Sequence, residues 1–314
     1  MLAFEKPFDK NSGKIREMEI GTQKKVVIGG ENTMPLYSFD GEITNKPVIA
    51  MEIVDYDPKE DWAEAAYAPI AGVAADPAAW AKLAVEKGAD MVCLKLVNAH
   101  PDRGNVSPED CAALAKKVTE AVEVPVIIEG CGHNDKDAEV LPKVAEALEG
   151  KNTVFLSANE HTYKAVGASV GLAYGNIVSA ESAVDINLAK QLNILLTQLG
   201  IKEEKIIINP GCAGVGYGFE YVYSAMERIR AAAIQQNDKT LQMPFILPYG
   251  EESWRTKEAS QPEEEFPAWG PSENRGIMME VVGATALLAA GAHAVILKHP
   301  TSVATVKKFI DEVL

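Results

Sequence analysis

Short apolar runs alternate with longer amphipathic runs along the chain, from about residue 47 onward. The apolar runs have the length of strands, and the amphipathic runs have the length of helices. In order, they predict strand 47–55, helix 76–88, strand 89–97, helix 107–122, strand 124–132, helix 137–150, strand 153–160, helix 163–175, strand 176–182, helix 184–200, strand 205–211, helix 220–236, strand 243–250, helix 273–291, strand 294–300 and helix 303–314. The pattern therefore predicts eight consecutive β-then-α units.

The expected strands are apolar almost throughout, which indicates a parallel sheet with helices on both faces. Eight units in 268 residues match a (β/α)8 barrel, or TIM barrel, whose usual size is about 250 residues. An open doubly wound sheet is the alternative, but it often carries a G-x-G-x-x-G turn after its first strand. No such turn follows strand 47–55. We therefore predict an α/β fold with a (β/α)8 barrel over residues 47–314.

Residues 1–46 form an extension that precedes the barrel. Within it, residues 24–42 read as a strand, a Gly-Gly turn and a second strand, and this pattern predicts a β-hairpin. The hairpin would either plug the bottom of the barrel or provide a docking surface. We favour the plug.

Composition and net charge argue against several classes of protein and of partner. Apolar residues make up 47% and charged residues 24% of the chain, and no apolar stretch approaches the roughly 20 residues of a membrane-spanning helix. The net charge of −15 argues against nucleic acid or an anionic membrane as a partner. The N-terminus lacks the apolar core of a signal peptide, and the four cysteines include no C-x-x-C pair. We expect a cytoplasmic protein with free thiols.

The C-terminal ends of the strands form the working face of a (β/α)8 barrel. Polar side chains at these ends are Glu52, Asp55, Lys95, Asn98, Glu129, Cys131, His133, Asn159, Glu160, Glu181, Asp185, Asn209, Tyr249, Glu251, Lys298 and His299. A desolvated lysine can form a Schiff base. Lys95 and Lys298 could do so, or each could pair with a neighbouring carboxylate such as Glu129 or Glu52.

The five histidines lie in different loops and lack the i, i+4 or H-x-H spacing of a metal site. A metal site built wholly from this chain is therefore not expected. His299 follows the last strand, and we expect it to line the mouth of the barrel. His293 lies just past Gly291, where we expect it to cap the preceding helix.

The segment NPGCAGVGYGFEY (209–221) is the most informative loop. Gly211, Gly214 and Gly216 allow positive φ and close backbone approach just before a helix, so the loop could cradle an anion or lie against a large planar ligand. Tyr217 and Phe219 follow directly. We therefore favour a contact surface over a loop that is merely flexible.

Segments spread over nearly the whole chain resemble one known family. They are VIGGENTMPLYSFDGE (27–42), KPVIAMEI (46–53), DINLAKQLNIL (185–195), NPGCAGVGYGFEYVYSAMERIR (209–230), SWRTKEAS (253–260), FPAWG (266–270) and ATALLAAGAHAVILKHP (284–300). Together they resemble the small subunit of the corrinoid iron–sulfur protein. That subunit is equivalent to the delta subunit of the archaeal acetyl-CoA decarbonylase/synthase complex.

The resemblance implies a barrel that forms a heterodimer with a larger subunit. The large subunit would carry the iron–sulfur cluster and share a cobamide (corrinoid) with the mouth of this barrel. Cobalt would carry a methyl group from methyltetrahydrofolate, or its methanogen counterpart, to acetyl-CoA synthase, in the methyl branch of the reductive acetyl-CoA (Wood–Ljungdahl) pathway. Further implied partners are the methyltetrahydrofolate methyltransferase and acetyl-CoA synthase/CO dehydrogenase. This chain has no cysteine cluster and no D-x-H-x-x-G corrinoid motif, so neither the cluster nor a cobalt ligand is expected in it.

For a corrin whose rim carries amides, the resemblance points to neutral hydrogen-bonding groups and to backbone that can approach the ring closely. The expected cofactor-binding residues are Asn98, Asn159, Asn187, Asn209, Gly211, Gly214, Gly216, Tyr217 and His299. The expected partner contacts are Phe219 and Trp254. No catalytic acid–base pair is expected, so the subunit would be non-catalytic or jointly catalytic.

A self-sufficient barrel enzyme is the alternative function, either a pterin-dependent methyltransferase or a lysine aldolase. DIN (185–187) and NPG (209–211) are similar to the pterin-site positions of methyltransferases with this fold. Fold likeness alone does not establish that activity. The long insertion between strand 243–250 and helix 273–291 favours the subunit of a methyl carrier, because loops of that length are usually functional.

Overall fold

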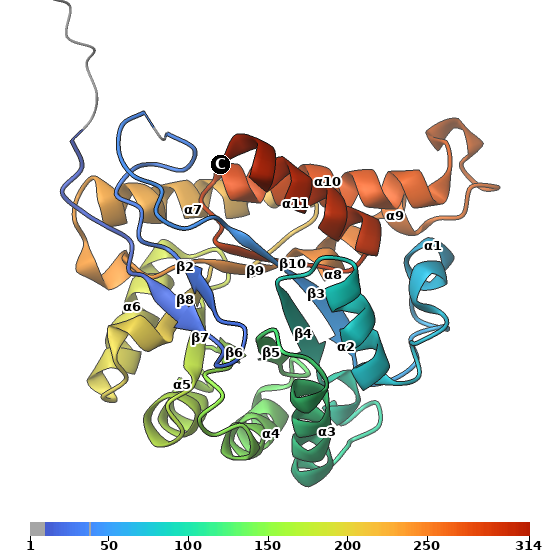
Figure 1. The fold of residues 1–314 in the computed structure, drawn as a ribbon, viewed down its shortest axis with the longest axis horizontal. Coiled ribbons are helices and arrows are strands. Elements are labelled where there is room, and N and C mark those ends of the chain that lie inside the picture. Colours follow the sequence, from blue (N-terminus) through green and yellow to red (C-terminus); the bar gives the residue numbers. More distant parts are fainter. Residues whose placement is uncertain (1–9, 38) are drawn as a thin grey trace, which may run out of the picture.

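Eight parallel strands form one curled sheet at the centre of the computed structural model, which describes residues 10–37 and 39–314 (Figure 1). The strands are β3 (Val48–Val54), β4 (Met91–Lys95), β5 (Val126–Glu129), β6 (Val154–Ala158), β7 (Ile177–Glu181), β8 (Ile206–Asn209), β9 (Ile246–Pro248) and β10 (Ala294–Leu297). They lie in the order β8-β7-β6-β5-β4-β3-β10-β9. A parallel bridge between Ile208 and Phe245 joins the two edge strands and closes the barrel. The predicted (β/α)8 barrel is confirmed.

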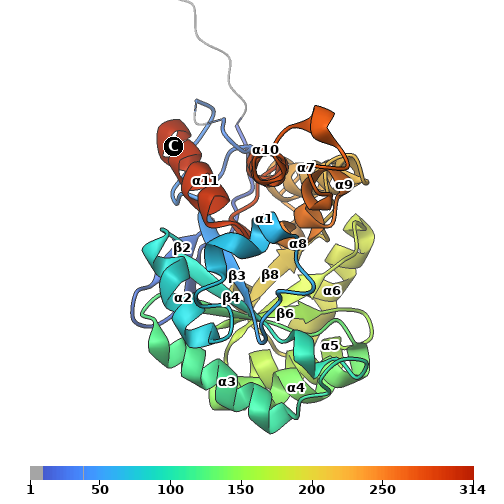
Figure 2. The same ribbon diagram turned by 90° about the vertical axis from the view of Figure 1, so that its right-hand side faces the viewer.

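Helices surround the strands in the perpendicular view (Figure 2). They are α2 (Pro77–Glu86), α3 (Pro108–Ala121), α4 (Asn134–Ala147), α5 (Tyr163–Val166), which continues into a π-helical segment (Gly167–Ala173), α6 (Ile186–Gln198), α7 (Phe219–Ile234), α10 (Ser272–Ala289) and α11 (Pro300–Val313). Short helices lie in two loops: α1 (Glu64–Tyr67) follows β3, and α8 (Tyr249–Trp254) and α9 (Lys257–Ser260) follow β9. No helix in the described part of the chain is both long and apolar enough to cross a membrane.

Local sequence explains where the helices begin. The Asp76 carboxylate accepts a hydrogen bond from the backbone N–H of Ala78, at 3.2 Å, and Pro77 takes the first helical position of α2. The Ser107 hydroxyl accepts from the N–H of Asp110, at 3.1 Å, and so caps α3. Such caps satisfy N–H groups that have no partner inside the helix.

A two-stranded antiparallel hairpin precedes the barrel, from β1 (Met18–Ile20) and β2 (Val26–Ile28). The apolar side chains of Met18, Ile20 and Ile28 are buried in one cluster with residues from the barrel interior, such as Met91 and Ile177 at the starts of their strands. The hairpin therefore covers the N-terminal end of the barrel, as a plug.

The predicted pairing within the hairpin is wrong. The partner of β2 comes before it in the chain, whereas a strand after Gly29 and Gly30 was expected. Residues 33–36 after that glycine pair form turns instead, and Ser38 of the expected second strand lies outside the described residues. Both glycines have positive φ, of 78° and 94°, and this conformation turns the chain away from the sheet.

A buried ionic cluster connects the segment after β2 to the barrel. The Glu31 carboxylate accepts a hydrogen bond from Nε2 of His293 at 2.6 Å, and Nδ1 of His293 accepts from the backbone N–H of Phe245 at 2.9 Å. The Arg230 guanidinium lies 3.0 Å from the same Nδ1 and 3.8 Å above the Phe245 ring. His293 therefore does not cap α10, contrary to the prediction, because both ring nitrogens are used inside this cluster.

Candidate functional site

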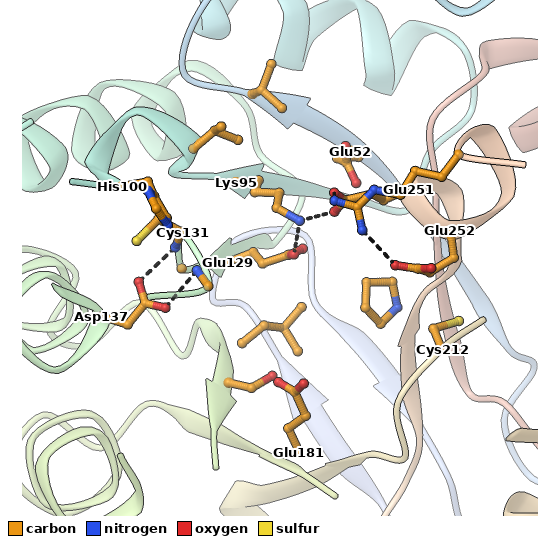
Figure 3. A pocket seen from close by; sticks show the side chains of 18 of the residues that line it. Glu52, Lys95, His100, Glu129, Cys131, Asp137, Glu181, Cys212, Glu251 and Glu252 are labelled. Carbon is orange, nitrogen blue, oxygen red and sulfur yellow. Dashed lines mark hydrogen bonds and ion pairs between the residues drawn. The ribbon is translucent and has the colours of Figure 1, made fainter. Parts of the chain in front are cut away.

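A cavity of about 590 Å³ opens at the C-terminal ends of the barrel strands (Figure 3). Its walls come from the ends of β3 to β10 and from the α8 segment. Residues that line it include Glu52, Trp62, Lys95, His100, Glu129, Cys131, Asp137, Ser157, Asn159, Glu181, Asn209, Gly211, Cys212, Glu251, Glu252, Trp254, Arg255 and Lys298. The cavity therefore lies on the face where (β/α)8 barrels place their working residues.

Lys95 is the centre of an ionic network in the cavity. Its Nζ lies 2.7 Å from Glu129 Oε1 and also contacts Glu251, which pairs in turn with Arg255 at 2.7 Å. Burial alone would lower the pKa of Lys95, but the charges of Glu129, Glu52 and Glu251 outweigh burial and hold the pKa well above its usual value. Lys95 is therefore a protonated ion-pair partner. A protonated amine is not the nucleophile that a Schiff base requires.

Lys298 and Glu52 form a second pair, at 3.3 Å between Nζ and Oε1. The ammonium also lies 4.4 Å from the centre of the Trp62 ring, a favourable cation–π arrangement. Burial raises the pKa of Glu52, and the charges of Lys298 and Lys95 oppose that rise. The second carboxylate oxygen, Oε2, is buried and has no hydrogen-bond partner. For both lysines, the predicted pairing with a carboxylate is confirmed.

Glu280 of α10 holds the end of β10 in place. Its fully buried carboxylate accepts hydrogen bonds from the backbone N–H groups of Lys298 (2.6 Å) and His299 (3.2 Å) and from Nε1 of Trp254 (3.1 Å). Trp254 in turn stacks on the His299 ring, with 5.8 Å between ring centres. A single acidic side chain therefore fixes Lys298 and the wall of the cavity formed by Trp254.

Two predicted site residues are corrected by this packing. His299 is 1% exposed, lies behind Trp254 and does not line the cavity. Trp254 lines the cavity but is only 6% exposed, because its indole N–H and ring face are both used internally. Trp254 therefore cannot belong to an exposed patch for a partner.

Other carboxylates shape the loops around the cavity. Asp137 accepts hydrogen bonds from the N–H groups of Cys131 (2.8 Å) and Gly132 (2.9 Å) and so holds the loop after β5. Asp55 accepts from the N–H of Asn98, and burial raises the pKa of Asp55 to about 6 against the effect of that bond. Burial also raises the pKa of Glu181, which the hydroxyl of Ser157 opposes.

The predicted asparagines divide into two groups. Asn159 and Asn209 line the cavity, whereas Asn98 and Asn187 do not. The Asn159 carbonyl oxygen accepts from the N–H of His161 (2.9 Å), and that of Asn209 accepts from the N–H of Gly211 (3.0 Å). These side-chain oxygens therefore stabilise their own loops. Asn159 Nδ2 also donates to Asn134 at 2.8 Å and Asn209 Nδ2 to Ser157 at 3.3 Å, so one N–H of each amide remains for a ligand.

The three glycines of the β8–α7 loop also differ. Gly211 lines the cavity at φ +90°, and Gly216 is exposed at φ +82° with no atom within 4 Å of where a Cβ would stand. A Cβ on Gly214 would lie 2.8 Å from the carbonyl oxygen of Glu252. Gly214 is buried and is not among the residues that line the cavity, so its predicted approach to a ligand stays a prediction without support from this geometry. Its lack of a side chain serves the packing of α8 on this loop.

The two aromatic residues of this loop have different surroundings. Tyr217 is 52% exposed, and its hydroxyl bonds to Glu258 of α9 at 3.2 Å. Phe219 is partly buried and packs edge-to-face on Tyr249 with 6.0 Å between ring centres. Tyr217 is therefore more exposed to solvent on this loop than Phe219.

The cavity is more strongly charged than the asparagine- and glycine-rich mouth that the sequence predicted. Six charged lining residues were identified as strand-end residues: Glu52, Lys95, Glu129, Glu181, Glu251 and Lys298. Five others were missed: Asp61, Arg103, Asp137, Glu252 and Arg255. A short α8 directly after β9 carries Glu252 and Arg255 into the cavity wall. No three His, Cys, Asp or Glu side chains within residues 10–37 and 39–314 are grouped as metal ligands.

Solved structures place the fold in a known class of (β/α)8 barrel. A dihydropteroate synthase from Xanthomonas albilineans, solved with 4-aminobenzoic acid, has a TM-score of 0.55 at 12% identity over 85% of this chain and 92% of that one. The dihydropteroate synthase of Yersinia pestis has a TM-score of 0.53 at 13% identity, over 95% and 98%. At such identity the likeness concerns the fold alone.

The family follows from closer sequence matches. The model of the CO dehydrogenase/acetyl-CoA synthase delta subunit matches residues 17–306, and the chain belongs to that family. Acetyl-CoA decarbonylase/synthase complex subunit delta 2 of Methanosarcina acetivorans is 34% identical over 94% of this chain and 70% of its own length. The delta subunit of Archaeoglobus fulgidus is 33% identical over 98% and 70%. The resemblance drawn from the sequence is confirmed.

Proposed function

We propose that this chain is the barrel subunit of a methyl-carrying complex and covers one face of a cobamide held by a larger subunit. The family match over residues 17–306 is the observation that carries this proposal. The large subunit would hold the iron–sulfur cluster. Methyl transfer would run from a methylated pterin such as methyltetrahydrofolate, through its methyltransferase, to acetyl-CoA synthase/CO dehydrogenase. When bound, cobalt would supply the nucleophile and carrier of the methyl group.

The residues at the mouth fit a corrin ring that lies over the cavity. The amides on a corrin rim need both donors and acceptors, and the cavity has donors at Asn159, Asn209 and Lys298 and acceptors at Glu52 and Glu181. Glu52 Oε2 is buried without a partner, as expected of an atom whose hydrogen bond a ligand completes.

The chain's own contribution would be positioning and the exclusion of water. Gly216 presents open backbone on the loop that follows β8, and Gly211 brings backbone to the cavity wall. Tyr217, exposed on the same loop, would contact the ring or the partner. The Lys95 network would hold α8 against the mouth, so that the cavity keeps its shape while successive partners approach.

A self-sufficient pterin-dependent methyltransferase is the second candidate. One solved dihydropteroate synthase of this fold is in complex with 7,8-dihydropteroate. The half-buried Glu181, beside Ser157 and Asn209, gives the cavity a carboxyl that could accept N–H groups of a heterocycle. Methyl transfer from methyltetrahydrofolate to free cobalamin separates the two functions. The isolated chain should show little turnover, and turnover near that of a dedicated methyltransferase would favour the second candidate.

The covering role itself is tested by a valine at Gly216 in the co-purified complex. Gly88 is a matched control, because it also has positive φ (+95°) and open space beyond its Cα but lies between α2 and β4, at the opposite end of the barrel. Both substitutions strain the backbone similarly. Gly216→Val should lower the cobalt content per complex while Gly88→Val leaves it unchanged. Full cobamide content in Gly216→Val would contradict the proposal that this loop covers the ring.

A further inference from the structure

The Glu52–Lys298 pair at the base of the cavity has unused hydrogen-bonding capacity. Glu52 is 1% exposed, its Oε1 pairs with Lys298, and its Oε2 accepts no hydrogen bond. Lys298 is 7% exposed, and among the described residues its ammonium pairs with Glu52 alone and lies over the Trp62 ring. An ammonium has three N–H donors. A buried carboxylate oxygen without a partner is costly to the fold.

The surrounding contacts show that this pair is held in place. The backbone N–H of Lys298 donates to the buried carboxylate of Glu280 at 2.6 Å, which fixes the end of β10. Glu52 belongs to the centre of β3, where Met51 and Ile53 on either side are fully buried. Glu52 lies on β3, and Lys298 directly follows β10, the adjacent strand that hydrogen-bonds to β3, so the free acceptor and the free donors stand side by side.

The paired charges select the kind of group that can bind there. A carboxylate or phosphate on the ligand would be repelled by the negative charge of Glu52, and an ammonium would be repelled by the positive charge of Lys298. A neutral group that carries one N–H donor and one carbonyl acceptor satisfies both residues at once. A primary amide has both, because its NH₂ donates and its oxygen accepts.

We infer that Glu52 and Lys298 form a subsite for a primary amide arm of the ligand. This inference rests on the proposed function, in which the ligand is a corrin whose rim carries such arms. The NH₂ group donates to Glu52 Oε2, and the carbonyl oxygen accepts from Lys298 Nζ. Val54 and Trp62, which also line the cavity, surround the methylene groups of the arm.

Two corrinoids that share the ring and differ in their arms test the inference on the full chain. Cobinamide carries amide arms, whereas the heptamethyl ester of cobyrinic acid has the same ring with methyl esters, which keep the carbonyls and lack N–H. Trp62 and Trp254 line the cavity, so quenching of tryptophan fluorescence reports binding of both. The wild-type chain should bind cobinamide at least tenfold more tightly than the ester. This comparison requires no variant.

A double variant then assigns the difference to the pair. Glu52→Met with Lys298→Met removes both charges at similar volume, which buried ion pairs often tolerate. It should bind the two corrinoids equally. The matched control, Arg16→Met with Glu203→Met, removes a partly buried pair outside the cavity and should keep the tenfold preference. Melting curves verify that each variant is folded.

The possible outcomes distinguish the amide subsite at Glu52 and Lys298 from the covering role of the whole chain. Equal affinity of the wild-type chain for amide and ester would overturn the inference, and so would a preference that persists in the Glu52–Lys298 double variant. In either case the covering role would stand, because corrinoid binding would remain. If neither corrinoid binds the wild-type chain, the amide subsite fails, whereas the covering role, in which the larger subunit holds the cobamide, is decided separately by the cobalt content of the Gly216→Val complex.

Discussion

Replacing Glu31 with glutamine should destabilise the fold without touching the cavity. Glu31 connects the segment after β2 to His293 and, through it, to Arg230, and it is only 9% exposed. Burial on its own would raise the pKa of Glu31, but the charges of His293 and Arg230 and the hydrogen bond from His293 lower it to about 2 from its ordinary 4.5. The ionised form is therefore strongly favoured in the folded protein.

The size of the effect follows from that pKa. At 1.36 kcal/mol per pKa unit, the difference between 4.5 and about 2 corresponds to about 3 kcal/mol of folding free energy. Removing one member of a buried ion pair costs about 3–5 kcal/mol, because its partner is left uncompensated. With about 2.1 cal/mol/K of unfolding entropy per residue in 314 residues, 3 kcal/mol lowers Tm by about 5 °C.

The direction of the pKa shift determines how the stabilising effect of Glu31 changes with pH. Because the pKa of Glu31 is lower in the folded state than in the unfolded state, its contribution is complete above about pH 4.5 and is lost as the pH falls toward 2. Wild type and Glu31→Gln should therefore differ in Tm at pH 7 and converge on acidification. Glu312→Gln, on an exposed pair with Lys308, is the control and should leave Tm nearly unchanged. A Tm for Glu31→Gln within 1 °C of wild type at pH 7 would refute the reasoning.

Two further predictions concern packing and lysine chemistry. A Cβ on Gly283 of α10 would lie 1.8 Å from the hydroxyl oxygen of Tyr249, so Gly283→Ala should cost about 2 kcal/mol or more in urea unfolding. Gly72→Ala, where no atom lies within 4 Å, should be close to neutral, and equal stabilities would contradict this packing. Borohydride treatment with pyruvate should leave Lys95 unmodified in the mass spectrum, because its ion pairs keep it protonated. A reduced adduct on Lys95 would revive the aldolase alternative.

The sequence predicted the barrel well because each strand and helix has its own local signal. All eight strands occur where the apolar runs indicated, and their helices occur where the amphipathic runs indicated. The differences arise where a single residue or a tertiary contact decides the boundary. Helix α4 begins at Asn134 because Nδ1 of His133 accepts from the N–H of Lys136, and β1 was missed because three residues with a central exposed glutamate carry almost no strand pattern.

The site could be predicted only in part. The ends of the strands show which side chains can face the cavity, but they do not show which of these side chains pair with one another. Lys95 and Glu129 lie at the ends of adjacent strands, and their pairing could be expected. Glu251 reaches Lys95 from 156 residues further along the chain, on a short helix whose position depends on the packing of Trp254 and Gly276, where a Cβ would lie 2.2 Å from the indole ring. Such long-range packing leaves no periodic signal in the sequence.

The charges in the cavity affect how it would select a ligand. A neutral mouth would select its ligand by shape and by many weak hydrogen bonds, each worth about 0.5–1.5 kcal/mol. In this structure most charges are paired, as those of Lys95 and Arg255 are with Glu129 and Glu251. These pairs contribute shape and rigidity but little net attraction for a ligand. In the proposed function, the groups that remain unsatisfied would therefore decide what binds, and among the described residues that line the cavity Glu52 has the buried side-chain oxygen without a hydrogen-bond partner. Under this proposal, recognition would be concentrated at the end of the cavity near β3 and β10, whereas the loop that carries Gly216 and Tyr217 would provide contact area.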